Sequence, residues 1–323
     1  MANTAKNSLI WLEHVPVTLF TLGMGLSGFS LALRAGERAL GLTNVLSLAA
    51  CALAIGVFLA VCLAYLAKAL RHPSAVAAEW NNPVKLAFFP AISISLLLLS
   101  AALLNLSMPV ARLLWCIAVP LQGVLTIAVI SGWISARAFL HGHLSPAWFI
   151  PVVGNVIVPI AGVQLGYVET SWFYASVGLI FWIVLLSLVM NRLIFHDPLP
   201  ERLQPTLVIL IAPPAVGFLG WVQLVGEVDS FARILLNGAY LFSLIVAVQL
   251  PRILRLPFSL SFWALSFPFA GVTIASFTYA EATGSMPHTV IGLALLALLC
   301  VIIAALLIRT AGAVRSGAVF QPD

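Results

Sequence analysis

The sequence predicts an all-α polytopic membrane protein, a single transmembrane domain over residues 1–323 with ten membrane-spanning helices. Three observations support this fold class: the composition, the length of the apolar stretches and the distribution of Lys and Arg. Of the 323 residues, 62% are hydrophobic and 8% are charged, whereas a soluble domain carries roughly 25% charged residues. Because so few charges cannot cover a water-facing surface, lipid must be the solvent for most of the chain.

Ten apolar stretches are long enough to cross a bilayer, which takes about 20 residues per helix. Short connections containing Gly, Pro, His or charged residues separate most of them. The boundary around residues 107–109 is the weakest, and merging its two stretches would leave nine spans and move the C-terminus to the other side. We expect spans at 15–35, 43–70, 86–107, 109–134, 147–167, 171–193, 204–226, 230–250, 259–281 and 288–311.

Basic residues are divided unevenly between the two ends of these spans. With the N-terminus inside, eleven of the fifteen Lys and Arg fall on the cytoplasmic side, whereas the acidic residues divide equally. Lys and Arg collect in cytoplasmic loops, so we expect both termini to lie in the cytoplasm. The protein is expected to be a multi-pass protein of the cell membrane (inner or plasma membrane). The net charge of +5 then follows from topology and indicates no nucleic-acid partner. The four basic residues on the outer side are Arg34, Arg38, Arg112 and Arg233.

Proline divides the ten spans into two kinds. Four odd-numbered spans contain internal prolines and the first has Pro16 near its start, whereas Pro120 is the one internal proline of the even-numbered spans. A proline kinks a helix, and the carbonyls that it frees need partners in the protein interior or along a water-filled cavity. We therefore predict five helical hairpins, each with a kinked inner and a straight outer helix, around a central pore. The alternative, that proline is simply common in transmembrane helices, stays open.

No Asp, Glu, Lys, Arg or His lies near the middle of a predicted span. Intramembrane ionisable residues mark proton relays and charge-coupled carriers, so their absence favours a passive conduit and leaves the sign of the permeant charge undetermined. The sequence also lacks G-x-S-x-G, H-E-x-x-H and phosphate-loop motifs. We expect no enzyme activity, no metal and no cofactor.

Asn155 is the most notable polar residue at depth. It could bond a permeating anion or satisfy a carbonyl freed by Pro151 or Pro159, and the second interpretation is slightly favoured. Phenylalanines are frequent on the odd-numbered spans. A ring in a pore can gate it by dewetting or occlusion, although most single phenylalanines simply pack.

Three runs of sequence resemble one family. They are Pro151-Val-Val-Gly-Asn155, Leu210-Ile-Ala-Pro213 and, most specifically, Phe262-Trp-Ala-Leu-Ser-Phe267. They are similar to the TehA-like tellurite-resistance/dicarboxylate transporter family, to whose superfamily the plant guard-cell slow anion channels belong. The resemblance covers essentially the whole chain. It departs at Thr21–Gly25, where a glycine replaces the proline usual in bacterial relatives, and at Pro268, which is closer to the plant pattern.

The resemblance implies a homotrimer with one pore per subunit, occluded by the phenylalanine that follows the serine of the third run, here Phe267. It implies transport of small inorganic anions such as chloride and nitrate, with a C4-dicarboxylate or sulfite/tellurite transporter as the alternative. A membrane enzyme or receptor is least favoured. Partners are thus anions and membrane lipid. The pore-lining candidates are Phe20, Gly23, Phe89, Pro90, Pro151, Asn155, Pro213, Phe218 and Pro268.

Overall fold

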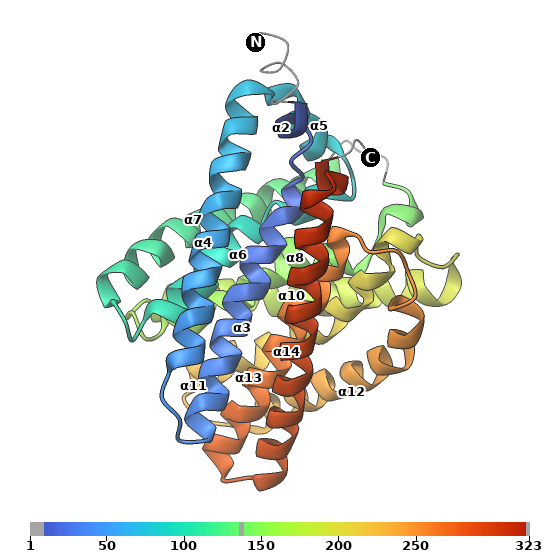
Figure 1. Ribbon diagram of the computed structural model, residues 1–323. Helices are drawn as coiled ribbons and strands as arrows, with labels where there is room; N and C mark the ends of the chain where they lie inside the picture. Colours follow the sequence, from blue (N-terminus) through green and yellow to red (C-terminus); the bar gives the residue numbers. More distant parts are fainter. Residues whose placement is uncertain (1–9, 136–138, 321–323) are drawn as a thin grey trace.

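The computed structural model describes residues 10–135 and 139–320 (Figure 1). Every regular element in this part of the chain is a helix, so the all-α class is confirmed. Lys6 and Arg137, counted above on the cytoplasmic side, lie outside the described residues. The elements are α2 (Ile10–Glu13), η1 (Val17–Leu19), α3 (Phe20–Ala39), α4 (Val45–Arg71), α5 (Pro73–Asn81), η2 (Lys85–Phe88), α6 (Ala91–Leu103), α7 (Met108–Ser135), η3 (His141–His143), η4 (Pro146–Trp148), α8 (Phe149–Val153), η5 (Gly154–Ile157), α9 (Val158–Gly162), α10 (Val168–Phe195), η6 (Glu201–Ile211), α11 (Ala212–Val225), α12 (Ser230–Ile253), η7 (Leu260–Leu265), α13 (Ser266–Thr283), α14 (Met286–Arg315) and η8 (Ala318–Phe320).

Nine helices within the described ranges are long and apolar enough to cross a membrane. A tenth apolar segment, Pro146–Gly162, is shorter and falls in the fifth predicted span. The two stretches around residues 107–109 form separate helices, because α6 ends at Leu103 and α7 begins at Met108. The chain is therefore an all-α polytopic membrane protein. The nine spans are Val17–Ala39, Val45–Arg71, Lys85–Leu103, Met108–Ile134, Val168–Phe195, Glu201–Val225, Ser230–Ile253, Leu260–Thr283 and Met286–Arg315.

Inner helices are more buried than outer helices, and the two kinds alternate along the chain as the positions of the prolines predicted. In the apolar stretches of the first, third, seventh and ninth predicted spans, 72–83% of residues are buried, against 22–39% in the even-numbered spans. Each inner element packs against the outer helix that follows it. The inner elements also contact one another in a closed ring, in the order α3, α6, α9, α11, α13 and back to α3. Five helical hairpins thus surround a common axis.

The inner elements are irregular where the sequence has proline. All five begin with a 3₁₀ segment (η1, η2, η4, η6 and η7), and the one that begins with η4 is also broken in the middle by η5. Pro159 follows η5 and has no N–H to donate to the carbonyl of Asn155. A 3₁₀ segment rises about 2.0 Å per residue against 1.5 Å in an α-helix. The broken inner segments therefore cover more of the membrane than their residue count suggests.

The helix α5 lies at the end of the molecule that also carries both termini (Figure 1). Its Glu79 is only 5% exposed. Around it lie Tyr65, Lys68 and Lys85, and we call these four residues the Glu79 cluster. The Glu79 carboxylate accepts hydrogen bonds from Lys68 Nζ and Tyr65 Oη, both at 2.9 Å, and from the backbone N–H of Val17 at 3.2 Å. Lys85 Nζ lies 3.8 Å from it. This cluster joins α5 to α4 and to the beginnings of two inner elements.

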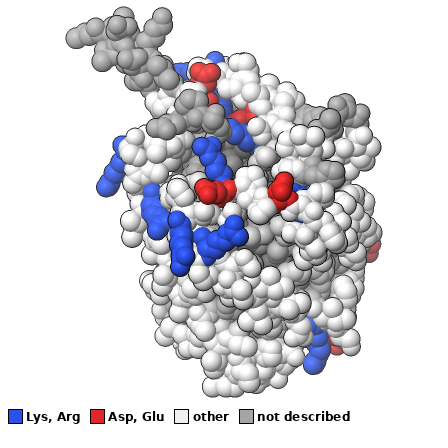
Figure 2. Space-filling view, turned by 90° about the vertical axis from the view of Figure 1, so that its right-hand side faces the viewer, with Lys and Arg blue, Asp and Glu red and all other residues white. Residues whose placement is uncertain are grey.

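Charges are gathered toward the same end. Figure 2 shows Lys and Arg, with some Asp and Glu, concentrated in the upper part of one face, while a broad surface below carries almost none. Large apolar side chains are exposed along the outer helices, among them Leu63, Phe173 and Leu244. Such a surface is typical of one that lies against lipid or against another protein surface.

Candidate functional site

Two cavities lie within the ring of inner helices. The larger, about 430 Å³, is lined by the C-terminal parts of the inner elements and by residues just after them. The smaller, about 40 Å³, is lined by their N-terminal and middle parts. The two cavities therefore follow the axis of the ring from opposite directions.

Phe267 and Val216 line both cavities. Phe267 is 8% exposed and lies against α3. Its ring fits there because residue 28 is glycine: a Cβ at Gly28 would lie 3.1 Å from Phe267 Cδ2 and 3.1 Å from Ala270 Cβ, closer than side chains usually pack. The ring of Phe267 thus lies where one cavity ends and the other begins.

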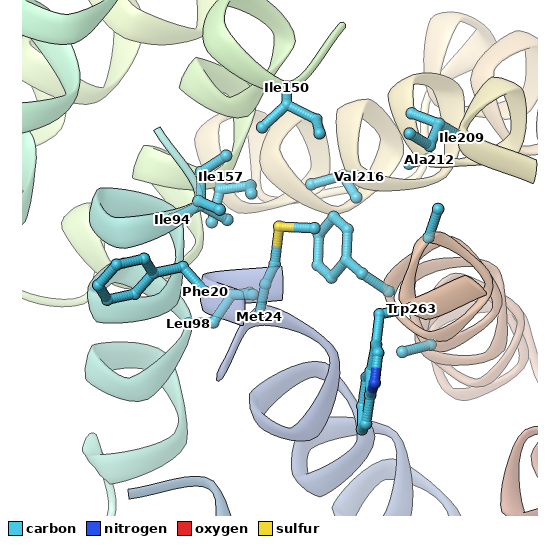
Figure 3. Packing of buried hydrophobic residues seen from close by; sticks show 14 of the residues in the cluster. Phe20, Met24, Ile94, Leu98, Ile150, Ile157, Ile209, Ala212, Val216 and Trp263 are labelled. Carbon is cyan, nitrogen blue, oxygen red and sulfur yellow. The ribbon is translucent and has the colours of Figure 1, made fainter. Parts of the chain in front are cut away.

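The smaller cavity is apolar. Figure 3 shows Met24 and Val216 directed toward one space from α3 and α11, with Ile94 and Ile157 beside it. Thr21 also lines it, but its hydroxyl donates to the carbonyl of Thr18 at 2.6 Å. An ion in this cavity would find little to replace its water.

The larger cavity is polar toward its mouth. Its polar lining comes from all five inner elements or the residues just after them, and from Thr289 of the outer helix α14. Arg38 pairs with Glu281 at 3.4 Å across α3 and α13. Arg34 Nη1 donates to the carbonyl of Ala102 on α6 at 3.4 Å. The polar and charged lining residues are Arg34, Arg38, Asn105, Gln164, Gln223, Thr278, Glu281 and Thr289.

Three of the expected site residues line a cavity: Phe267, as described, and Pro213 and Pro268, which line the smaller one. Phe20 faces α4, with its ring 5.4 Å from Tyr65, and Figure 3 shows it pointing away from Met24. The other expected pore-lining residues lie outside both linings.

Two of them also mark contacts with outer helices. Gly23 makes room for α4, because a Cβ there would lie 2.9 Å from Phe58. Phe218 is fully buried in a cluster that includes Leu235 of α12. Phe89 packs edge-on against Trp80 of α5, with ring centroids 4.9 Å apart.

The remaining three candidates lie where two of the inner elements change from 3₁₀ to α-helical geometry or are broken. Pro90 precedes α6, and its carbonyl accepts from Ser93 Oγ at 2.9 Å. The carbonyl of Pro151 accepts from Thr126 Oγ1 at 2.8 Å and from Gln122 Nε2 at 3.2 Å, both on the outer helix α7. Asn155 Nδ2 donates to the carbonyl of Val152 at 2.7 Å and to Thr126 at 3.1 Å. Its amide therefore serves the backbone.

The sequence analysis missed the stripe that faces the axis. On α3 this stripe is Thr21, Met24, Gly28, Leu31 and Ala35, at intervals of three and four residues. That spacing is one face of an α-helix. The neighbouring choices Phe20 and Gly23 lie about 100° away around the same helix. If one residue of α3 were known to face the axis, steps of three and four residues from it would have located the other residues of the stripe.

Comparison with known proteins agrees with the resemblance in the sequence. The family model described as "Voltage-dependent anion channel" matches residues 14–311. The chain is 27% identical over 260 residues to S-type anion channel SLAH3 of Arabidopsis thaliana, covering 80% of this chain and 41% of that protein. It is 24% identical over 313 residues to the guard cell S-type anion channel SLAC1 of the same plant, covering 93% and 56%.

A bacterial relative is covered along more of its length. The tellurite resistance protein TehA homolog of Haemophilus influenzae is 24% identical over 260 residues, covering 80% of this chain and 79% of that protein. By contrast, the chain spans about half the length of the plant relatives. With the family model covering nearly every helix of the ring, the chain belongs to the voltage-dependent anion channel family.

Proposed function

We propose that this protein is an anion channel whose conduction path follows the axis of the five inner helices and is closed by the ring of Phe267. The observation that carries the proposal is the position of Phe267 between the two cavities, both of which it lines. The plant relatives are named as anion channels. No catalytic activity is proposed, and the permeant anions are chloride- or nitrate-like.

The closed path has a simple physical basis. The smaller cavity, about 40 Å³, has room for only a few water molecules, each of which needs about 10–15 Å³ of such space. An ion on that side of Phe267 would have to shed most of its hydration shell against apolar side chains, and burying an unpaired charge is very unfavourable. The ring and the apolar lining therefore oppose conduction together.

The test is Phe267→Ala in oocytes or planar bilayers, with chloride as the charge carrier. Removing the ring joins the two cavities, so we expect the anion current to rise at least about tenfold, the rate change for a barrier lowered by about 1.4 kcal/mol. Phe269→Ala is the matched control, because Phe269 is a buried phenylalanine of the same helix that lines neither cavity. Equal currents in the wild type and Phe267→Ala, with both proteins present at the membrane, would remove the gate assignment.

A carrier for C4-dicarboxylates or for sulfite or tellurite is the second candidate. The larger cavity, about 430 Å³, has the size of a small-molecule site, and one relative is named for tellurite resistance. Saturable flux with counter-transport would favour a carrier, whereas a current that grows with voltage and does not saturate with concentration would favour the channel.

Topology and assembly belong to the same proposal. The distribution of Lys and Arg supports cytoplasmic N- and C-termini in the inner or plasma membrane, and the family resemblance supports a homotrimer with one path per subunit. Reporter fusions at each terminus test the first statement, and native mass spectrometry of the purified protein tests the second. Membrane lipid would then cover the outer helices that do not contact another subunit.

A further inference from the structure

The charges that line the larger cavity do not balance. They are Arg34, Arg38 and Glu281. Arg38 and Glu281 form a pair at the mouth, 3.4 Å apart, with side chains 59% and 63% exposed. Their charges offset each other, so the lining keeps one positive charge, that of Arg34.

Arg34 is held on the wall of this cavity by a neighbouring inner helix. Its Nη1 donates to the carbonyl of Ala102 on α6 at 3.4 Å. A guanidinium has five N–H donors, so this bond leaves most of them for another acceptor. Within residues 10–135 and 139–320, no carboxylate oxygen comes within 4.0 Å of the guanidinium.

The nearest acidic residue along α3 is committed elsewhere. Glu37 is 4% exposed, and its carboxylate accepts from the backbone N–H groups of Leu46 at 2.7 Å and Ser47 at 3.2 Å. These are the first N–H groups of α4, where a negative charge is favourable. Glu37 therefore faces the outer helix and does not line the cavity that Arg34 lines.

A pair of glutamines adds neutral donors to the same cavity. Gln164 and Gln223 line it from the segment after α9 and from α11. Gln164 Nε2 donates to the carbonyl of Ile160 at 3.3 Å and to Gln223 Oε1 at 3.4 Å, so the amide nitrogen that offers donors to an anion is that of Gln223. A positive charge and amide N–H donors in one cavity favour an anion over a cation.

We propose that Arg34 binds and concentrates small monovalent anions in the larger cavity and is the residue that makes its mouth prefer anions to cations. This inference deepens the proposed function and rests on it for the claim that the bound anion goes on to permeate. A unit charge about 5 Å from an ion in water enriches the ion roughly fourfold, and low-dielectric walls strengthen the effect. Arg38 adds little because Glu281 offsets it.

Binding is tested without any current. Crystals of the wild type, Arg34→Gln and the double variant Arg38→Gln/Glu281→Gln are grown in sodium bromide, and bromide is located by anomalous diffraction. We expect a bromide peak at the Arg34 guanidinium in the wild type and in the double variant, and its loss in Arg34→Gln. A wild type without this peak, or an Arg34→Gln variant that keeps it, would overturn the proposal.

Selectivity is tested in the Phe267→Ala background at low salt. Adding Arg34→Gln should lower the current carried by anions that enter through the larger cavity roughly fourfold. Arg34→Lys, and Arg38→Gln combined with Glu281→Gln, should keep most of the current, because in each the lining retains one positive charge. The difference should shrink in 1 M salt, where the screening length is about 3 Å. An Arg34→Gln current equal to that of the Arg38→Gln/Glu281→Gln double variant would contradict the proposal. If Phe267→Ala itself carries no current, the gate assignment fails and the bromide experiment alone decides the role of Arg34.

Discussion

The Glu79 cluster provides a sharp test of how the helices are held at the end that carries both termini. The perturbation is Glu79→Gln, which removes the negative charge and keeps an oxygen that can still accept from the N–H of Val17. Lys68, which is 2% exposed, would then lose its carboxylate partner. Its one other described acceptor is the carbonyl of Val15, at 2.8 Å.

The expected magnitude follows from burial. Removing one partner of a buried ion pair costs about 3–5 kcal/mol, because the remaining charge is left uncompensated. For a chain of this length roughly 2 °C of melting temperature corresponds to 1 kcal/mol. Glu79→Gln should therefore melt roughly 6–10 °C below the wild type.

The assay is thermal unfolding of the purified protein in detergent, followed by tryptophan fluorescence. The matched control is Glu281→Gln, the same substitution in the exposed pair with Arg38. Exposed pairs contribute about 0–1 kcal/mol, so its melting temperature should change by less than about 2 °C. Adding Lys68→Met to Glu79→Gln should restore part of the loss, because no uncompensated charge then remains at position 68. A Glu79→Gln protein that melts within 2 °C of the wild type would refute this account of the cluster.

Two further predictions concern packing and pH. Gly25→Ala should destabilise the protein by about 1–3 kcal/mol, since the new Cβ would lie 2.8 Å from Ser266 Cβ and α3 and α13 would have to separate. Gly56→Ala on α4, where no atom lies within 4 Å of the new Cβ, is the control and should melt no lower than the wild type. The Asp229 carboxylate caps α12 by accepting from the N–H of Ala232 at 2.8 Å and is also bonded by the Trp221 indole N–H, which together hold the pKa of Asp229 below its ordinary 3.8. A carboxyl with a lowered folded-state pKa stabilises the fold above its unfolded-state pKa and loses this effect as pH falls through the folded-state value. The melting difference between the wild type and Asp229→Asn should thus stay constant from pH 5 to 8 and shrink below about pH 4; a difference that changes steadily above pH 5 would contradict it.

The sequence predicted the membrane class and the division into inner and outer helices, and both are confirmed. Proline carries this information because its effect is local: Pro159 interrupts its own helix wherever the chain is placed. The run Phe262–Phe267 indicated Phe267, and of the proposed site residues Phe267 is the one that lines both cavities. Its gating role stays a prediction until the current is measured.

The rotation of each inner helix about its own axis could not be predicted. A surface helix shows its orientation through a polar and an apolar face. In the first half of α3, however, neither the side that packs against α4 nor the side that faces the cavities carries a charged residue. This is why Phe20 and Gly23 were chosen in place of Met24 and Gly28. The serines gave no help, because Ser27 donates to the carbonyl of Gly23 on its own helix at 2.7 Å.

Long-range polar pairs were equally hidden. Nothing in the sequence links Glu79 to Lys68, against which it is buried, or His72 to Glu13, which lies 4.0 Å away. Gln122 and Thr126 belong to an outer helix, yet they complete the backbone of a broken inner one. Such pairings depend on which helices become neighbours, which the spacing of residues along one helix does not reveal.

The unequal size of the two cavities has an electrical consequence. A cavity of about 430 Å³ that opens at a polar mouth admits solution, so the potential of that side extends inward as far as Phe267. The membrane voltage must then fall mainly across the remaining apolar stretch. A full drop amounts to about 2.3 kcal/mol per unit charge for each 100 mV, and an ion beside the ring would experience most of it within a few side chains. Even without an ionisable residue at the middle of a helix, an occupant of this path would respond strongly to voltage.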